Sequence, residues 1–170
     1  MNLSNVSKTA IITMTCRSAQ TENPKSDFND PMSVQSLRRL TDLASESEKK
    51  TIQKIKKTYG SYSKKEAQSL VKRVSSVDRI VNGYISKNQD CTVINIACGF
   101  DTRYWRLDRR DCTYIELDLP EVIDQKKALL GDQINYEMVS SSVLDFDWID
   151  EVTKERNSNF VVVMEGLLMY

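Results

Sequence analysis

The stretch Val93–Leu107, VINIACGFDTRYWRL, decides the fold of this 170-residue chain. Its first part, together with Thr92, is a run of β-branched residues, which predicts a buried strand. Cys98 and Gly99 follow at once. A glycine after such a run predicts a tight turn, because a residue without a Cβ can bend the backbone sharply and approach a ligand closely.

The same pattern returns three times toward the C-terminus. Short strand-like runs lie at residues 113–118 (TYIELD), 136–139 and 160–165 (FVVVME). A helix is expected at 121–130, and a polar helix or loop at 145–155. Strands that alternate with helical connections are typical of βαβ units. We therefore predict an α/β fold with a Rossmann-like parallel sheet.

Residues before about 90 carry helical spacing instead. The best segment runs from residue 63 to 87, where apolar side chains recur every three or four positions as Leu70, Val74, Val77, Val81 and Tyr84. Weaker helices are expected at 4–19 and 46–57, and another begins at Asp30-Pro31, with Asp30 as the N-cap. The sequence thus predicts two domains: a helical cap over 1–90, and the four-stranded first half of a sheet over 91–170.

Composition excludes several classes of function. Lys and Arg number 24, as do Asp and Glu, so no overall field attracts nucleic acid or an anionic membrane. The longest apolar run is too short to span a bilayer. With no histidine, the chain lacks imidazole for a catalytic triad or a zinc site, and we expect no metal. Four scattered cysteines favour reduced thiols and a cytoplasmic protein.

Three features lie where parallel sheets bind ligands, at the carboxyl ends of the expected strands. They are Gly99, Asp118 and Glu165. An acid about 20 residues after the glycine turn is placed to bind ribose hydroxyls. The loop has one glycine instead of G-x-G-x-x-G, and Asp101 beside it should repel phosphates and favour a cation. This pattern favours S-adenosylmethionine over NAD, and makes a nucleotide-dependent oxidoreductase the weaker alternative.

The stretch Val93–Leu107 resembles the signature of the leucine carboxyl methyltransferase family. Three more stretches resemble the same family in the expected order: residues 6–18 followed by Asp30-Pro31, residues 114–126 (YIELDLPEVIDQK) and residues 162–170 (VVMEGLLMY). The D-T-R-x-x-R-L and E-x-D-x-P elements are fairly specific to it. The resemblance implies the class I fold of O-methyltransferases that use S-adenosylmethionine.

The resemblance also implies roles for single residues. The donor's carboxylate would be bound from the helical cap, its methionine part would lie over the Ala97–Gly99 turn, and a carboxylate would face its methyl group. Ala97 departs from the family, which usually has glycine there. The implied donor-binding residues are Lys8 and Arg73 (carboxylate), Ala97 and Gly99 (turn), Asp118 (ribose), Ser142 and Val143, with Asp145 as an alternative (adenine), and Glu165 (methyl group), while Asp101, Arg103 and Arg106 would fix the turn and the entrance.

The implied activity is transfer of a methyl group to a carboxylate or hydroxyl of a protein, such as a C-terminal carboxylate, or of a small molecule. The alternative is a truncated donor-binding or interaction module without catalysis. The family's sheet continues beyond the fourth strand, so we expect that strand to lie at an exposed edge. The chain would then be a fragment, a truncated gene product, or a protein whose edge is covered by a partner or a second copy.

Overall fold

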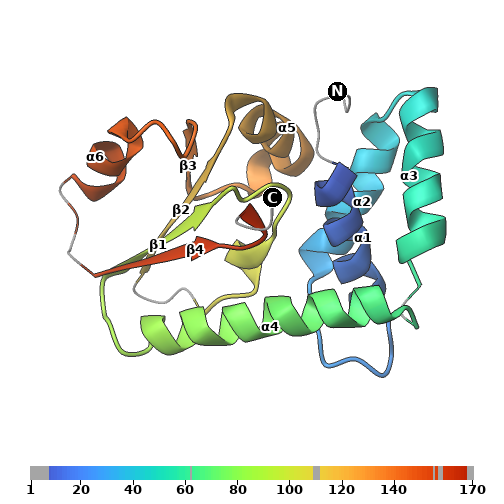
Figure 1. Cartoon of the computed structure of the whole chain (residues 1–170), viewed down its shortest axis with the longest axis horizontal. Helices are drawn as coiled ribbons and strands as arrows, with labels where there is room; N and C mark the ends of the chain where they lie inside the picture. The colour runs from blue at the N-terminus through green and yellow to red at the C-terminus, as the bar shows by residue number, and fades with distance from the viewer. Residues whose placement is uncertain (1–7, 62, 109–111, 155, 157–158, 168–170) are drawn as a thin grey trace. The chain divides into compact units, whose positions relative to one another are not determined.

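The computed structural model describes residues 8–61, 63–108, 112–154, 156 and 159–167. Four helices precede a region in which strands and helices alternate, as the sequence predicts (Figure 1). The elements, in chain order, are α1 (Lys8–Thr21), α2 (Pro31–Leu43), α3 (Glu46–Tyr59), α4 (Lys65–Ile85), β1 (Cys91–Ile96), the short 3-10 helix η2 (Arg103–Trp105), β2 (Cys112–Asp118), α5 (Pro120–Leu130), the 3-10 helix η3 (Gly131–Gln133), β3 (Glu137–Ser140), α6 (Asp147–Thr153) and β4 (Phe160–Met164).

The chain forms two compact units and passes between them more than once. The first, helical unit comprises residues 1–78 and 100–106, and the second, sheet unit comprises residues 79–99 and 107–170. The loop after β1 is therefore divided, because Gly99 belongs to the sheet unit and Phe100 to the helical unit.

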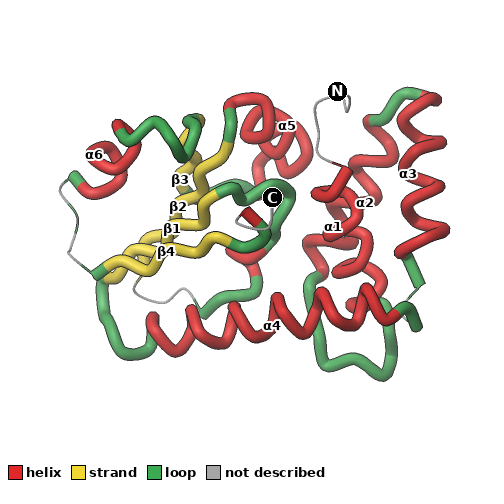
Figure 2. The backbone as a smooth tube through the Cα atoms, viewed as in Figure 1, coloured by secondary structure: helices red, strands yellow, loops and turns green. Residues whose placement is uncertain are grey.

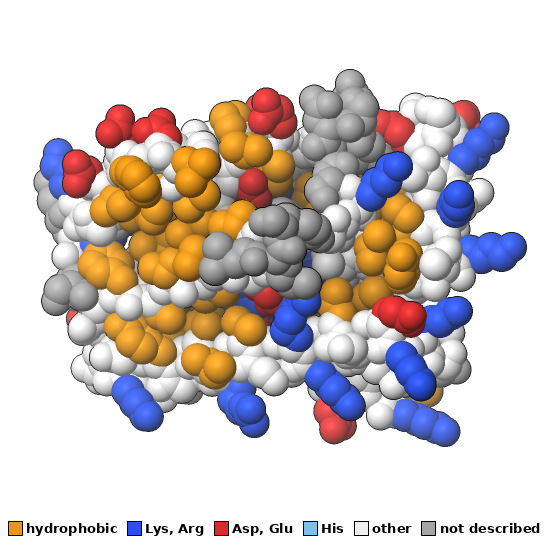
Figure 3. All heavy atoms as spheres, viewed as in Figure 1, with side chains coloured by type: hydrophobic (Ala, Val, Ile, Leu, Met, Phe, Trp, Pro, Cys, Tyr) orange, Lys and Arg blue, Asp and Glu red, His pale blue; other side chains and the backbone are white. Residues whose placement is uncertain are grey.

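Local capping signals set the helix starts in the helical unit. Asp30 is the N-cap of α2, as predicted, and its carboxylate accepts a hydrogen bond from the Ser33 amide while Pro31 occupies the first turn. In α3, Ser45 and Glu48 form a reciprocal capping box. Only Ile52 and Ile55 of α3 are buried, and Figure 3 shows basic side chains, which in this helix are lysines, projecting from its surface. That distribution matches a solvated, amphipathic helix.

The sheet is entirely parallel and has the strand order β3-β2-β1-β4 (Figure 2). The register pairs Ile94 with Ile115 on one side and with Val162 on the other. One sheet face carries a core cluster that includes α6, formed by Ile94, Ile96, Ile115, Leu117, Val139, Trp148 and Val152. On the other face, Lys126 of α5 meets Glu116 of β2. These observations confirm the Rossmann-like α/β class.

Strand order locates the ligand-binding edge. From β1 the chain moves outward to β2 and β3, then returns to place β4 on the other side of β1. In open parallel sheets, ligands bind at the carboxyl ends of the strands next to such a reversal. The ends of β1 and β4 are therefore the expected site. Within the described residues, none of the helices combines the length and the apolar character that crossing a bilayer requires.

The four cysteines differ in exposure, which leads to a first prediction. Cys16, Cys91 and Cys98 are buried, whereas Cys112 is partly exposed. Burial raises the pKa of Cys16 to about 11, although Arg17 opposes this, and burial also raises the pKa of Cys91. Because the thiolate is the reactive form, a brief exposure to maleimide at pH 7 should modify Cys112 first. Peptide mapping by mass spectrometry checks this order, with Cys112→Ser as the control. Equally fast labelling of Cys16 would contradict it.

Candidate functional site

The loop after β1 makes the tight turn that its glycine predicts. Gly99 has a φ of 50°, and Ala97 has a φ of 51°. Both values lie in the left-handed region, which glycine enters freely and alanine enters only with strain. The Cys98 amide donates to the Leu117 carbonyl (3.4 Å), which holds the turn against the end of β2.

Asp118 lies directly against this turn. Its Oδ2 accepts a hydrogen bond from the Gly99 amide (2.7 Å), and its Oδ1 accepts one from the Leu119 amide (2.8 Å). Each carboxylate oxygen can accept more than one hydrogen bond, and the residue is partly exposed. Asp118 is therefore fixed in place and still able to accept hydrogen bonds from a hydroxyl pair, which fits the ribose role predicted for it.

The loop after β3 reaches the same place. The Ser141 amide donates to the Asp118 carbonyl (3.0 Å), so the residues that follow lie beside the end of β2. Ser142 accepts from the Leu144 amide through its hydroxyl (3.2 Å), and the Val143 carbonyl accepts from Trp148 Nε1 (3.2 Å). Ser142 and Val143 are partly buried, whereas Asp145 is exposed. This arrangement favours the first two for an adenine contact, which stays a prediction.

Glu165 comes directly after β4, on the other side of β1. The last residues of the two strands, Ile96 and Met164, are register partners. Glu165 therefore follows β4 at the same level at which Ala97 follows β1. Glu165 is partly buried. Its proximity to a donor methyl group stays a prediction.

The two cations predicted to bind the donor's carboxylate belong to the helical unit. Lys8 is exposed at the first position of α1. Arg73 is exposed on α4 and lines an open hollow of about 460 Å³ together with Lys65, Glu66, Ser69 and Leu70. Their contact with a donor stays a prediction.

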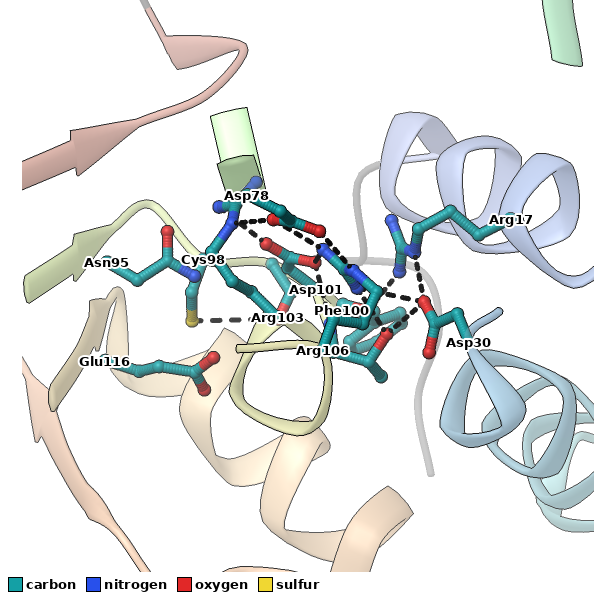
Figure 4. Close-up of polar contacts among 12 residues, drawn as sticks. Arg17, Asp30, Asp78, Asn95, Cys98, Phe100, Asp101, Arg103, Arg106 and Glu116 are labelled. Atoms are coloured by element: carbon teal, nitrogen blue, oxygen red, sulfur yellow. Dashed lines mark hydrogen bonds and ion pairs between the residues drawn. The ribbon is translucent and has the colours of Figure 1, made fainter. Parts of the chain in front are cut away.

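Asp101 corrects one step of the sequence argument. The sequence favours a free carboxylate that attracts a cationic ligand beside the turn. Instead, Arg103 Nη1 (2.9 Å) and Arg106 Nη2 (3.1 Å) bind the Asp101 carboxylate and neutralise it (Figure 4). These contacts agree with the expectation that Asp101, Arg103 and Arg106 fix the loop. The single-glycine loop, and not the charge of Asp101, is therefore the feature that favours S-adenosylmethionine over NAD in the sequence.

The sequence prediction does not include a buried polar cluster between β2 and α5, close to Asp118 in the chain. Lys126 Nζ lies 2.7 Å from Glu116 Oε2, and the Tyr136 hydroxyl donates to the same oxygen (3.0 Å). Glu116 is 0% and Lys126 1% exposed. Since Glu116 precedes Asp118 by two positions, this ion pair ties α5 to the strand that carries the ribose candidate. A glutamate within an apolar strand was the available signal, because isolated charges are rarely buried.

The strained Ala97 leads to a second prediction. Replacement by glycine should raise the free energy of unfolding by about 0.5–1 kcal/mol, because relief of the left-handed conformation outweighs the added freedom of the unfolded chain. It should also strengthen binding of S-adenosylhomocysteine, since a methyl group leaves the turn. Denaturant titration and calorimetry measure the two effects.

Asp90 provides the matched control, because it too has a positive φ (56°) but precedes β1 at the opposite end of the strand. Asp90→Gly should leave affinity for the ligand unchanged. Weaker ligand binding by Ala97→Gly would contradict the placement of the turn beneath the ligand.

No group of three or more His, Cys, Asp or Glu side chains within the described ranges is arranged to hold a metal ion. The candidate site consists of a strained turn, the carboxylate fixed beside it and the adjoining loop after β3. Such an arrangement can hold a nucleoside through backbone groups and one carboxylate.

Comparison with known proteins identifies several relatives of this chain. The chain is 27% identical over 171 residues to the tetracenomycin polyketide synthesis O-methyltransferase TcmP of Streptomyces glaucescens, covering 100% of this chain and 58% of that protein. It is 23% identical over 178 residues to the S-adenosyl-L-methionine-dependent methyltransferase dpfgK of Gibberella zeae, covering 100% of this chain and 57% of that protein. A shorter match, 31% over 58 residues, covers 32% of this chain and 18% of a probable leucine carboxyl methyltransferase 1 of Caenorhabditis briggsae.

The chain thus spans less than three fifths of the length of the first two relatives. The profile of one family, leucine carboxyl methyltransferase, matches residues 10–170. That match begins within α1 and covers every later element through β4, in both units. The chain belongs to the leucine carboxyl methyltransferase family.

Proposed function

We propose that the chain binds S-adenosylmethionine and forms the donor-binding part of an O-methyltransferase. The observation that carries the proposal is the 2.7 Å hydrogen bond from the Gly99 amide to Asp118, which joins the turn after β1 to the carboxylate after β2. A nucleoside can lie against this turn with its ribose on Asp118. Two relatives that align with the whole chain are named as methyltransferases, which supports the same reading.

The residues present suit methyl transfer. S-adenosylmethionine supplies both the methyl group and the leaving group, so the protein's task is to bring the acceptor into line with the sulfonium. Asp118 would hold the ribose, the Ala97–Gly99 turn would support the methionine part, and Glu165 would face the reacting end. A carboxylate acceptor needs no general base, which fits a chain without histidine.

The acceptor class extends the proposal. We infer a carboxylate or a hydroxyl, on a protein or a small molecule, because relatives include a polyketide O-methyltransferase and a probable leucine carboxyl methyltransferase. A phenolic hydroxyl would require deprotonation by a side chain, and only Asp, Glu, Lys, Tyr or Cys would be available in this chain. A donor-binding or interaction module without catalysis is the alternative.

Two experiments test the proposal. Isothermal titration calorimetry with S-adenosylhomocysteine and with NAD should show binding of the first and no binding of the second. Tight binding of NAD alone would overturn it. Transfer of a labelled methyl group to a peptide carboxylate or a phenol then separates the enzyme from the module, because the module would bind the donor without consuming it.

The outer edge of β4 suggests a partner. Among the described strands, β4 pairs only with β1, and its Val162 and Met164 are 46% and 45% exposed. An exposed apolar edge strand can pair with another strand through its backbone N–H and C=O groups. We propose that a further polypeptide or a second copy covers it. We also propose a cytoplasmic protein, because the four cysteines are scattered along the chain, as reduced thiols are. Sedimentation at increasing concentration tests self-association, and a strictly monomeric chain would exclude the second copy.

A further inference from the structure

A buried cluster of charges in the helical unit holds the loop that continues from the turn (Figure 4). Asp30, the N-cap of α2, is 0% exposed and accepts hydrogen bonds from three side chains of two other segments, α1 and the loop 100–106. Its Oδ2 accepts from Arg17 Nε of α1 (3.2 Å), from the Thr102 hydroxyl (2.6 Å) and from Arg106 Nη1 (2.9 Å). This is more than a helix cap requires, since the Ser33 amide on Oδ1 already satisfies that role.

Asp78 adds a second carboxylate to the cluster, beside Asp101. Asp78 of α4 accepts from Arg103 Nε through Oδ1 (2.7 Å) and from Arg106 Nε through Oδ2 (2.7 Å). Burial alone would lower the pKa of Arg106, but the carboxylates of Asp101, Asp30 and Asp78 outweigh it and raise the pKa above its ordinary value. We call the members the loop-clamp cluster: Arg17, Asp30, Asp78, Asp101, Thr102, Arg103 and Arg106.

The loop-clamp cluster also fixes the backbone. Arg17 Nη2 donates to the Phe100 carbonyl (2.7 Å), and Phe100 is the residue directly after Gly99. The Thr102 amide donates to Asp101 Oδ1 (2.8 Å), so the chain is fixed at alternate positions as it leaves the turn. Buried ion pairs add little net stability compared with apolar packing, but in some proteins they specify one conformation where several would otherwise compete.

We propose that Asp30, Thr102 and Arg106 are positioning residues for the donor's amino-acid part. They fix residues 100–106 and thereby set the conformation of the Ala97–Gly99 turn that precedes them. None of the three contacts the donor in this account, which rests on the proposed function. The nucleoside part is held by Asp118, which lies outside the loop-clamp cluster, so the two parts of the donor should respond differently when the cluster is weakened.

Thr102→Val tests the proposal with a nearly isosteric change. It removes the 2.6 Å hydrogen bond to Asp30 and the 3.1 Å hydrogen bond that the hydroxyl accepts from Arg106 Nη1, and it leaves every charge of the cluster in place. Affinity for S-adenosylhomocysteine should fall about tenfold, because charge-assisted hydrogen bonds that fix the loop are lost. Affinity for 5′-methylthioadenosine, which has the nucleoside but no amino-acid part, should change less than twofold. Calorimetry on folded protein, verified by circular dichroism, measures both.

Two variants complete the design. Thr102→Ser keeps the hydroxyl and should restore binding of S-adenosylhomocysteine close to the original affinity. Glu22→Gln removes an exposed ion pair with Arg38 in the same unit and should change neither affinity. Equal losses for both ligands in Thr102→Val would reveal a merely structural role and overturn the inference, as would no loss for either. An unmodified chain that binds neither ligand would instead refute the proposed function, and the inference with it.

Discussion

Replacing Asp118 with alanine should lower affinity for S-adenosylhomocysteine by about a hundredfold or more, the effect of losing charge-assisted hydrogen bonds to two hydroxyls. The substitution also leaves the Gly99 amide without its carboxylate acceptor, so the turn loses one of its two described hydrogen bonds to β2. Both consequences weaken the binding of S-adenosylhomocysteine. Calorimetry with the purified variant, at a temperature well below its unfolding transition, measures the loss.

Asp124→Ala is the matched control. Asp124 lies exposed on α5, close to Asp118 in sequence, and its carboxylate has no role in the proposed site. Its removal should leave affinity unchanged. If Asp118→Ala kept the original affinity, the ribose assignment would be wrong, and the glycine turn alone would have to account for binding.

The second large effect concerns stability. Arg106→Met should lower the free energy of unfolding by about 3–5 kcal/mol, because removal of one partner from a buried ionic cluster leaves uncompensated charge. Arg106 contacts Asp30, Asp78 and Asp101, and its side chain is 5% exposed. After the change, Arg17 remains paired with Asp30, and Arg103 remains paired with Asp78 and Asp101. Denaturant titration measures the loss.

An exposed arginine of the same unit provides the comparison. Arg38 pairs with Glu22 at 3.5 Å, and its side chain is 74% exposed. Arg38→Met should change the free energy of unfolding by less than about 0.5 kcal/mol. Similar losses from the two substitutions would show that Arg106 stabilises the chain through packing of its alkyl stem rather than through the loop-clamp cluster.

The sequence predicts the order and type of the elements, because the periodicity of apolar residues is a local property. The helix α4 shows the limit of that reasoning. Val74 and Val81 are buried as expected, but Leu70 is only partly buried and Asp78 lies on the buried face. A prediction based on the spacing of apolar residues does not place a charged residue on the buried face. Asp78 is buried because two arginines from a distant loop neutralise it.

The residues of the site also differ in how far the sequence reveals their roles. Gly99 and Asp118 stand out in the sequence because strand ends and a characteristic spacing identify them. Asp30 could be predicted only as a helix cap, since its partner Arg106 is 76 residues away. Local patterns cannot reveal pairings over such distances. A signal was present nevertheless, because two arginines and an aspartate in D-T-R-x-x-R, between apolar residues, need partners if they are buried.

The central claim is that the turn after β1 and the carboxylate after β2 together hold a nucleoside. Titration of the isotopically labelled chain with S-adenosylhomocysteine, followed by two-dimensional NMR of the backbone amides, tests it most directly. The amides of Gly99, Leu119 and Val143 should shift most, while Ile52 of α3 should remain unchanged. Absence of shifts at Gly99 and Leu119, or shifts confined to other parts of the chain, would contradict the account.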